Sequence, residues 1–267
     1  MILCAAGDIH GALDRLYEAV LAFENSLGVQ FEWVLHVGDF GVWPDPDRVD
    51  RATRRHGDAG DFPVWCAEGR AAPRPTLFIK GNHEDFDWLE AQARREILPN
   101  LTYLRNGETF DAGGVTIGGV GGCHGPSSYG RRSRDLQGRA RRHYTREDVD
   151  RLIGAGRVDV LLTHDAPAGV VFPRHRMGAN WASNAAGLDD LVRAVRPQVC
   201  FFGHHHIRVD GDIEGVPCLG LNLVGRPGNL VALRIEGRRW TLLGEWPTDS
   251  PGRTLRGLNP GAGERSG

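Results

Sequence analysis

The sequence has no long hydrophobic run, almost no lysine and no large excess of either positive or negative charge. No apolar stretch approaches the roughly 18 residues that a membrane-spanning helix needs, so no such helix is predicted. Lys80 is the only lysine, and arginine supplies the rest of the 32 basic residues, which face 34 acidic ones. This balance gives no overall attraction to nucleic acid. An arginine bias throughout the chain also makes clusters of arginine weak support for phosphate binding.

The five cysteines show no paired spacing, which favours free thiols in a reducing compartment over disulfides. Cys4 and Cys200 fall within apolar runs and are expected to be small buried residues. The first residues, MILCAAGDIHG, have no basic segment ahead of the apolar run, so they predict a strand and not a signal peptide. We therefore expect a cytoplasmic protein with no membrane attachment and no obligate protein partner.

Short apolar runs bounded by glycine alternate with helical patterns. Such runs predict buried strands, and they cover residues 2–10, 33–39, 76–84, 115–124, 158–165 and 199–206. Apolar residues at helical spacing predict a first helix from Leu13 to Leu27 and a second one around Trp88, Leu89 and Ala93. Thr145 and Asp148 form a capping-box pattern before another helix. Strands that alternate with helices predict an α/β fold.

A single domain is expected over residues 1–246, because neither an internal repeat nor a second boundary is visible. Near its end, two strand-like segments flank a tight turn at EGR (236–238), which predicts a hairpin at the sheet edge. Residues 247–267 are dominated by Pro, Gly, Ser and Arg and have little to bury, so they predict a loose tail.

Polar side chains follow nearly every predicted strand. They are Asp8, His10, Asp39, Asn82, His83, His164, His204 and His206. The carboxyl ends of strands are where sites assemble in open α/β sheets, so we expect these side chains to lie close together. Successive side chains of an extended chain alternate sides, so His204 and His206 can converge while His205 points away.

The residue types indicate a metal site. Imidazole, carboxylate and amide groups without thiolate suit borderline or hard divalent cations such as Mn, Fe, Zn or Ni. The candidate ligands are Asp8, His10, Asp39, Asn82, His164, His204 and His206. Seven ligands are too many for one ion, but they fit two ions if one carboxylate bridges them. Any one of these residues alone could be a turn or a cap, whereas five clusters at strand ends argue against chance.

The ordered motifs GDIHG (7–11), GD (38–39), GNHE (81–84), THDAP (163–167) and GHHH (203–206) resemble those of the calcineurin-like metallophosphoesterases. The resemblance runs from residue 7 to about residue 206 and implies a layered sandwich of two mixed β-sheets flanked by helices. It also implies a binuclear site. Asp8, His10 and His206 would hold one cation. Asn82, His164 and His204 would hold the other, and Asp39 would bridge the two.

The same resemblance implies that a hydroxide bridging the two metals attacks a phosphate ester while His83 acts as the general acid. Some members carry a carboxylate three residues past the bridging Asp, which orients this histidine, but Val42 stands there in this chain. The group that orients His83 therefore stays open, and Glu84, Asp85 or a backbone carbonyl could serve. The missing Asp-Arg-Gly pattern argues against a protein phosphatase and against a symmetric diadenosine tetraphosphatase.

Within the superfamily, the order of GDFG (38–41), GNHE, the segment 98–122 and THDAP is most similar to the RNA lariat debranching enzymes. Those enzymes carry Cys where this chain has Asp8, so full occupancy of both metal sites is expected here. The predicted function is hydrolysis of a nucleotide or RNA-like phosphodiester. The alternatives are a phosphomonoesterase acting on nucleotides or proteins and a non-catalytic scaffold of the same fold. The complete set of site residues argues against the scaffold.

Two further segments are expected to flank the site. Residues 123–146 hold seven arginines against one acid, Asp135, and are interpreted either as a lid that clamps phosphate or nucleic acid or as a solvated loop. The candidate substrate contacts there are His124, Tyr129, Arg131 and Arg132. Residues 42–75, with a helical pattern at 47–57, are expected to form a second wall. Trp43 and Trp65 in this wall either stack on a base or cover the sheet edge.

Overall fold

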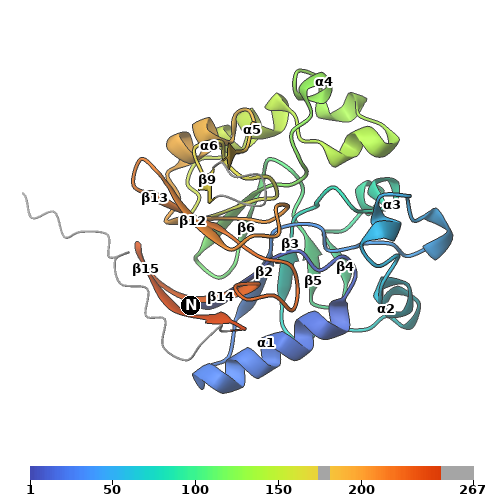
Figure 1. Ribbon diagram of the computed structural model, residues 1–267, viewed down its shortest axis with the longest axis horizontal. Coiled ribbons are helices and arrows are strands. Elements are labelled where there is room, and N and C mark those ends of the chain that lie inside the picture. Colours follow the sequence, from blue (N-terminus) through green and yellow to red (C-terminus); the bar gives the residue numbers. More distant parts are fainter. Residues whose placement is uncertain (174–180, 248–267) are drawn as a thin grey trace, which may run out of the picture.

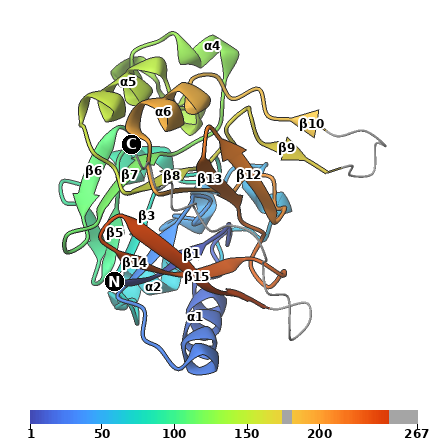
Figure 2. The same cartoon turned by 90° about the vertical axis from the view of Figure 1, so that its left-hand side faces the viewer.

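Two mixed β-sheets lie face to face, with helices against both outer faces (Figures 1 and 2). The computed structural model describes residues 1–173 and 181–247. This arrangement confirms the α/β sandwich of two mixed sheets flanked by helices that the motifs imply.

The first sheet has the strand order β15-β14-β1-β2-β3-β5-β4. Its members are β1 (Ile2–Ala6), β2 (Trp33–His36), β3 (Thr76–Phe78), β4 (Glu96–Leu98), β5 (Leu101–Tyr103), β14 (Leu230–Glu236) and β15 (Arg239–Trp246). β1, β2, β3 and β5 run parallel, so their carboxyl ends lie at one edge of the sheet. β14 and β15 form the expected antiparallel hairpin, and β15 is an edge strand, as predicted.

The second sheet has the order β12-β13-β11-β8-β7-β6. Its members are β6 (Glu108–Asp111), β7 (Thr116–Val120), β8 (Val160–Thr163), β11 (Val199–Phe202), β12 (Val209–Ile213) and β13 (Val216–Gly220). β7, β8, β11 and β13 are parallel. A separate two-stranded ribbon pairs β9 (Val171–Phe172) with β10 (Trp181–Ala182) and projects from the sandwich (Figure 2).

The helices differ in length and in the face they cover. They are α1 (Leu13–Leu27), α2 (Phe62–Glu68), α3 (Phe86–Glu90), α4 (Pro126–Tyr129), α5 (Arg146–Gly154) and α6 (Leu188–Val195). Short 3₁₀ turns occur at Pro46–Arg48, Thr53–Arg55, Ser133–Asp135 and Gly138–Arg142. α1 lies on the outer face of the first sheet, and α5 and α6 cover the second sheet (Figure 2).

The alternation of side chains along each strand separates the core into layers. In β1, Leu3 and Ala5 face the second sheet, while Cys4 and Ala6 face α1. This is the two-residue period of a strand that is buried on both faces. Every one of these side chains is fully buried, so the strand cannot shift without losing apolar contacts on both sides.

Most of the predicted elements are present, but the strands are shorter than predicted. Each of the six predicted strands ends before its polar cluster, which lies in the following loop. α1 matches its predicted bounds, and α5 begins with the predicted capping box of Thr145 and Asp148. Cys4 and Cys200 are buried and free, as expected.

Three predictions need correction or lie outside the structure. The second helix ends at Glu90, so Ala93 is exposed beyond it. The helical pattern at 47–57 forms no α-helix but contains two 3₁₀ turns, because Asp45 and Asp50 each bond backbone N–H groups locally. Residues 248–267 of the predicted tail lie outside the described residues. Within the described chain, no helix is long and apolar enough to cross a membrane.

Candidate metal centre

The predicted site residues converge at one end of the sandwich, where both sheets contribute. Asp8 and His10 follow β1, Asp39 follows β2, and Asn82 follows β3 of the first sheet. His164 follows β8 of the second sheet, and His204 and His206 follow β11. These are the carboxyl ends of parallel strands in both sheets, so rigid strands hold each short loop in place.

Two groups of potential metal ligands lie in this region and share one carboxylate. The first group is Asp8, His10, Asp39 and His206, and the second is Asp39, His164 and His204. Within each group the ligand atoms lie within 4.8 Å of one another. Asn82 joins the second group, because its Oδ1 lies 3.0 Å from Nε2 of His164. The structure therefore brings together all seven predicted ligands around two adjoining positions.

The donor atoms fit two cations. Nε2 of His10 lies 3.1 Å from Nε2 of His206, and Nδ1 of His10 is buried without a hydrogen-bond partner among the described residues. Nδ1 of His164 bonds the carbonyl of Val37 at 2.9 Å, so Nε2 presents a lone pair to the centre. A cation between such inward-facing lone pairs would replace their repulsion with attraction.

The carboxylates of the centre repel one another. Burial, followed by the charges of Asp8 and Glu84, raises the pKa of Asp39 well above its ordinary value. Burial also tends to raise the pKa of Asp8, but the hydrogen bond from His206 and the nearby imidazoles lower it overall. A cation bound between Asp8 and Asp39 would stabilise the ionised form of both carboxylates.

Burial keeps three imidazoles of the centre neutral. Burial lowers the pKa of His10 and of His164 to about 3 in each case, and burial also lowers the pKa of His204. Because only the neutral ring has a free nitrogen lone pair, these histidines are ready to bind a metal near neutral pH.

Four of the seven predicted ligands have left-handed backbone conformations. The φ angles are 47° at His10, 51° at Asp39, 64° at His204 and 53° at His206. Such conformations are uncommon for residues other than glycine and concentrate at functional sites. They turn the loops after β1, β2 and β11 sharply at the candidate ligands.

Two glycines allow the loops to approach the ligands. A Cβ atom at Gly81 would lie 2.0 Å from Oδ1 of Asp39, and one at Gly203 would lie 2.1 Å from Oδ1 of Asp8. Neither position has room for a methyl group unless a candidate ligand moves. The glycine in GNHE and the glycine in GHHH therefore belong to the geometry of the centre.

We expect Gly81→Ala to weaken metal binding by roughly 10- to 100-fold, the effect typical of disturbing the surroundings of ligands. The added methyl group would push Asp39 away from its shared position. Gly154→Ala, at the end of α5, is the matched control because its Cβ would meet nothing within 4 Å. Titration with Mn²⁺ against a chelating dye measures both affinities. Unchanged affinity in Gly81→Ala would show that Asp39 is not confined as described.

His83 lies beside the two clusters, and its partner differs from the prediction. Its Nδ1 lies 3.0 Å from Oγ1 of Thr53, and its ring meets that of His10 edge-on at 5.2 Å. Thr53 thus contacts the ring, and none of the three candidates, Glu84, Asp85 or a backbone carbonyl, forms this contact among the described residues. No motif pointed to Thr53, because it precedes His83 by 30 residues and belongs to another loop.

The two acids after His83 have structural roles instead. Glu84 accepts hydrogen bonds from the backbone N–H groups of Phe40, Gly41, Val42 and Gly81. It thereby ties the loop after β2 to the loop after β3. Asp85 caps α3 by accepting from the N–H of Trp88, and it pairs with Arg48 at 2.9 Å.

His205, His124 and Tyr129 lie along the flank of the second cluster. Nε2 of His205 lies 3.2 Å from Asp165, and the backbone N–H of His124 donates to the other oxygen of this carboxylate at 2.9 Å. The rings of His124 and Tyr129 are 5.5 Å apart. His205 thus contacts Asp165 and belongs to neither ligand group of the described structure. The role of His124 and Tyr129 in binding substrate stays a prediction.

The arginine-rich segment is folded against the opposite wall of the site. Arg139 pairs with Asp50 at 3.6 Å, and Arg141 pairs with Asp87 of α3 at 2.9 Å. These pairs hold the segment that follows α4 near α3 (Figure 1). Arg131 and Arg132 line a hollow of about 600 Å³ between α4 and α5, whose lining includes none of the seven predicted ligands. Their contact with substrate stays a prediction.

The tryptophans of the wall are packing residues. Trp43 and Trp65 are buried, and their indole N–H groups donate to the carbonyl of His83 and to Asp14, respectively. Of the two interpretations, burial rules out stacking on a base in this conformation.

His56 is a further imidazole at the site that the sequence pattern did not predict. Its ring stacks on that of His10 with ring centroids 4.5 Å apart. It follows no strand, so the pattern of strand ends could not reveal it.

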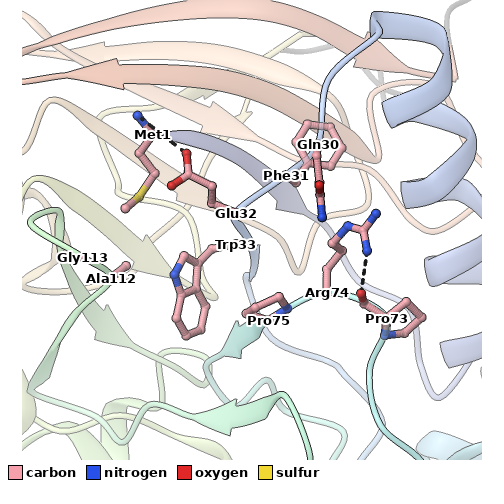
Figure 3. Close-up of a pocket in the computed structure, with 10 residues that line it drawn as sticks. All are labelled: Met1, Gln30, Phe31, Glu32, Trp33, Pro73, Arg74, Pro75, Ala112 and Gly113. Atoms are coloured by element: carbon pink, nitrogen blue, oxygen red, sulfur yellow. Dashed lines mark hydrogen bonds and ion pairs between the residues drawn. The ribbon is translucent and has the colours of Figure 1, made fainter.

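A second hollow of about 600 Å³, drawn in Figure 3, is lined by none of the seven predicted ligands. It is lined by Trp33 at the start of β2 and by Pro75 just ahead of β3, and Glu32 pairs with the amino group of Met1 at its edge. These positions are at the amino ends of strands whose carboxyl ends carry the ligands. The hollow is therefore at the opposite end of the sheet from the candidate site.

His36 makes the stability of the metal-free protein sensitive to acid. Its ring is fully buried at the end of β2, and burial lowers its pKa from about 6.5 to about 4. The unfolded chain binds the proton more readily, so the stabilisation is complete above pH 6.5 and is lost as the pH falls toward 4. We expect a loss of about 2 kcal/mol by pH 5 from this residue.

The variant His36→Gln keeps an acceptor for the N–H of Gly38 but cannot take up the proton. Urea unfolding at pH 7.5 and pH 5 in the presence of a chelator measures the difference. The variant should lose less stability than the wild type over this interval. An equal loss in both proteins would rule out His36 as a source of the acid sensitivity.

Comparison with known proteins agrees with the geometry of the site. The lariat debranching enzyme of Drosophila melanogaster is 27% identical over 230 residues, which are 78% of this chain and 43% of the relative. The enzyme of the same name from Arabidopsis thaliana is 25% identical over 240 residues, covering 80% of this chain and 56% of the relative. The chain thus spans about half the length of these curated relatives.

Solved structures share the fold at low sequence identity. A Thermus thermophilus protein superposes with a TM-score of 0.55 at 12% identity, covering 91% of this chain and 98% of that one. A putative 5′-nucleotidase from Staphylococcus aureus gives 0.52 at 13% identity, covering 90% and 52%. The model of the family described as calcineurin-like phosphoesterase matches residues 1–208. This match includes every strand-end cluster described above, and the chain belongs to the calcineurin-like phosphoesterase family of metal-dependent enzymes.

Proposed function

We propose that this protein is a two-metal phosphodiesterase that hydrolyses a nucleotide or RNA-like phosphodiester, with manganese as the working metal. The observation that carries the proposal is the pair of ligand clusters that share Asp39, with His83 beside them. The similarity to lariat debranching enzymes favours a diester of this kind as the substrate.

In this proposal, seven residues would bind the two cations that activate the phosphate and the water. Asp8, His10 and His206 would hold one cation, Asn82, His164 and His204 the other, and Asp39 would bridge them. When bound, two divalent cations would polarise the phosphate and lower the pKa of a water molecule between them. Phosphoryl transfer depends mainly on such positioning and on neutralising charge at the phosphate oxygens.

His83 would give a proton to the departing oxygen. Its Nδ1 is engaged by Thr53, so Nε2 is the nitrogen left for the substrate. Burial, together with the nearby His56, lowers the pKa of His83 to about 4, whereas the charge of Asp50 acts in the opposite direction. The ring is therefore neutral in the free protein, and the negative phosphate of the substrate favours its protonated form.

Hydrolysis of bis-p-nitrophenyl phosphate and of p-nitrophenyl phosphate in Mn²⁺ tests the proposal. We expect the diester to be cleaved with the higher kcat/KM. A strong preference for the monoester would make the protein a phosphomonoesterase. Failure to cleave either substrate, with both metals bound, would favour a non-catalytic scaffold.

A further inference from the structure

Thr53 connects His83 to a carboxylate that lies outside the ligand clusters. Thr53 begins the 3₁₀ turn Thr53–Arg55 in the wall formed by residues 42–75. Its side chain is 1% exposed, and its Oγ1 lies 3.0 Å from Nδ1 of His83, in a buried contact. A buried hydroxyl at this distance from an imidazole fixes the rotation of the ring.

Asp50 holds the backbone of Thr53 in place. One of its oxygens accepts the backbone N–H of Thr53 at 2.8 Å. Partial burial tends to raise the pKa of Asp50, but hydrogen bonds from the backbone and hydroxyl of Thr53, and the charge of Arg139, lower it overall. Asp50 is therefore a carboxylate that can only accept hydrogen bonds at neutral pH.

The protons available on Asp50, Thr53 and His83 determine which of these groups donates each hydrogen bond and which accepts it. We assign the one proton of the Thr53 hydroxyl to Asp50, because an ionised carboxylate can only accept and this one already accepts the N–H of Thr53. The oxygen of Thr53 must then accept from Nδ1–H of His83. This fixes the tautomer of the neutral ring, in which Nε2 carries the lone pair and takes up the proton that is later transferred.

We propose that Thr53 and Asp50 are positioning residues for His83, which replace the orienting carboxylate missing at Val42. The inference rests on the proposed function, in which His83 donates a proton. As the P–O bond to the leaving group breaks and oxygen from water bonds to phosphorus, the Nε2 proton passes to the departing oxygen. The imidazole becomes neutral, and its Nδ1–H stays with Thr53.

The variant Thr53→Val removes the hydroxyl with little change in shape, and Thr53→Ser restores it. The two substrates are thymidine 5′-(p-nitrophenyl phosphate), whose leaving group needs little protonation, and thymidylyl-thymidine, whose alkoxide needs a proton. We expect Thr53→Val to lose roughly 10²-fold in kcat on the dinucleotide, at the lower end of general acid effects. It should lose less than about threefold on the nitrophenyl ester, and Asp50→Asn should show a smaller loss of the same pattern.

Thr76→Val is the matched control, since Thr76 is equally buried and bonds Tyr17 far from the clusters. It should leave the ratio of the two rates unchanged, and Thr53→Ser should stay near wild type. A loss in Thr53→Val that is equal on both substrates, or no loss on either, would overturn the inference. Two metal ions per chain in each variant exclude an effect through the metal centre.

Nitrogen-15 NMR of the imidazoles in the magnesium-loaded protein gives a readout without turnover. We expect the Nδ1–H tautomer at His83 in the wild type and in Thr53→Ser, and its loss in Thr53→Val. An Nε2–H tautomer in the wild type would make Thr53 the donor and contradict the inference. If the wild type cleaves neither substrate, the proposed function fails, while the NMR result still decides whether Thr53 holds the ring.

Discussion

The variant Asp39→Ala is expected to lose both bound metals at micromolar concentrations and to hydrolyse phosphodiesters at least ~10³-fold more slowly than the wild type. The size follows from the several kcal/mol of charge stabilisation that metal ions supply in phosphoryl transfer. Asp39 is the only residue common to both ligand groups of the described structure. One of its oxygens also accepts the N–H groups of Asn82 and His83, at 2.6 and 2.8 Å. Its removal therefore disturbs both metal positions and the loop after β3.

Elemental analysis after gel filtration and a rate assay in Mn²⁺ measure these two effects. The matched control is Asp148→Ala, which removes another buried carboxylate, from the capping box of α5. This control should lower stability but keep its metals. If Asp39→Ala retained two ions per chain, the shared carboxylate would not be the bridge between them.

The variant His83→Ala is expected to keep its metals and to lose 10²- to 10⁴-fold in kcat on substrates with poor leaving groups, the range typical of general acid catalysis. His83 belongs to neither ligand group, although its backbone N–H bonds Asp39. Replacing its side chain leaves this backbone bond in place. The loss should shrink on p-nitrophenyl esters, whose leaving group needs little protonation.

His143→Ala provides the control for removal of an imidazole. His143 contacts Cys123 and lies in neither ligand group, so its removal should change kcat by less than a factor of about three. Metal content and kcat are measured on the same preparations. A loss of metal from His83→Ala would give this residue the role of a ligand, and an unchanged kcat would remove it from the mechanism.

The sequence alone could predict the candidate metal ligands because each one follows a buried strand. Hydrophobic runs locate the strands, and the parallel arrangement brings their carboxyl ends together, so Asp8 and His206 meet although they follow strands of different sheets. The predicted strands were too long for a related reason. The loops after β1, β2 and β11 contain left-handed residues, and glycines there and after β3 approach the candidate ligands closely. These features end the strands early. The pattern of hydrophobic residues does not indicate them.

The surroundings of His83 could not be predicted in the same way. Thr53 and His56 belong to a loop that has no strand end to fix its place, and the pattern at 47–57 looks helical. The nearby acids Glu84 and Asp85 were plausible partners by proximity in sequence. The structure assigns Glu84 to four backbone N–H groups, because a buried carboxylate is best satisfied by several donors at once.

The most direct measurement is a manganese anomalous-scattering map of a crystal grown with excess Mn²⁺. The account predicts two peaks roughly 3.5–4 Å apart with the carboxylate of Asp39 between them. Asp8, His10 and His206 should surround one peak, and Asn82, His164 and His204 the other. A single peak, or two peaks that do not share Asp39, would contradict it.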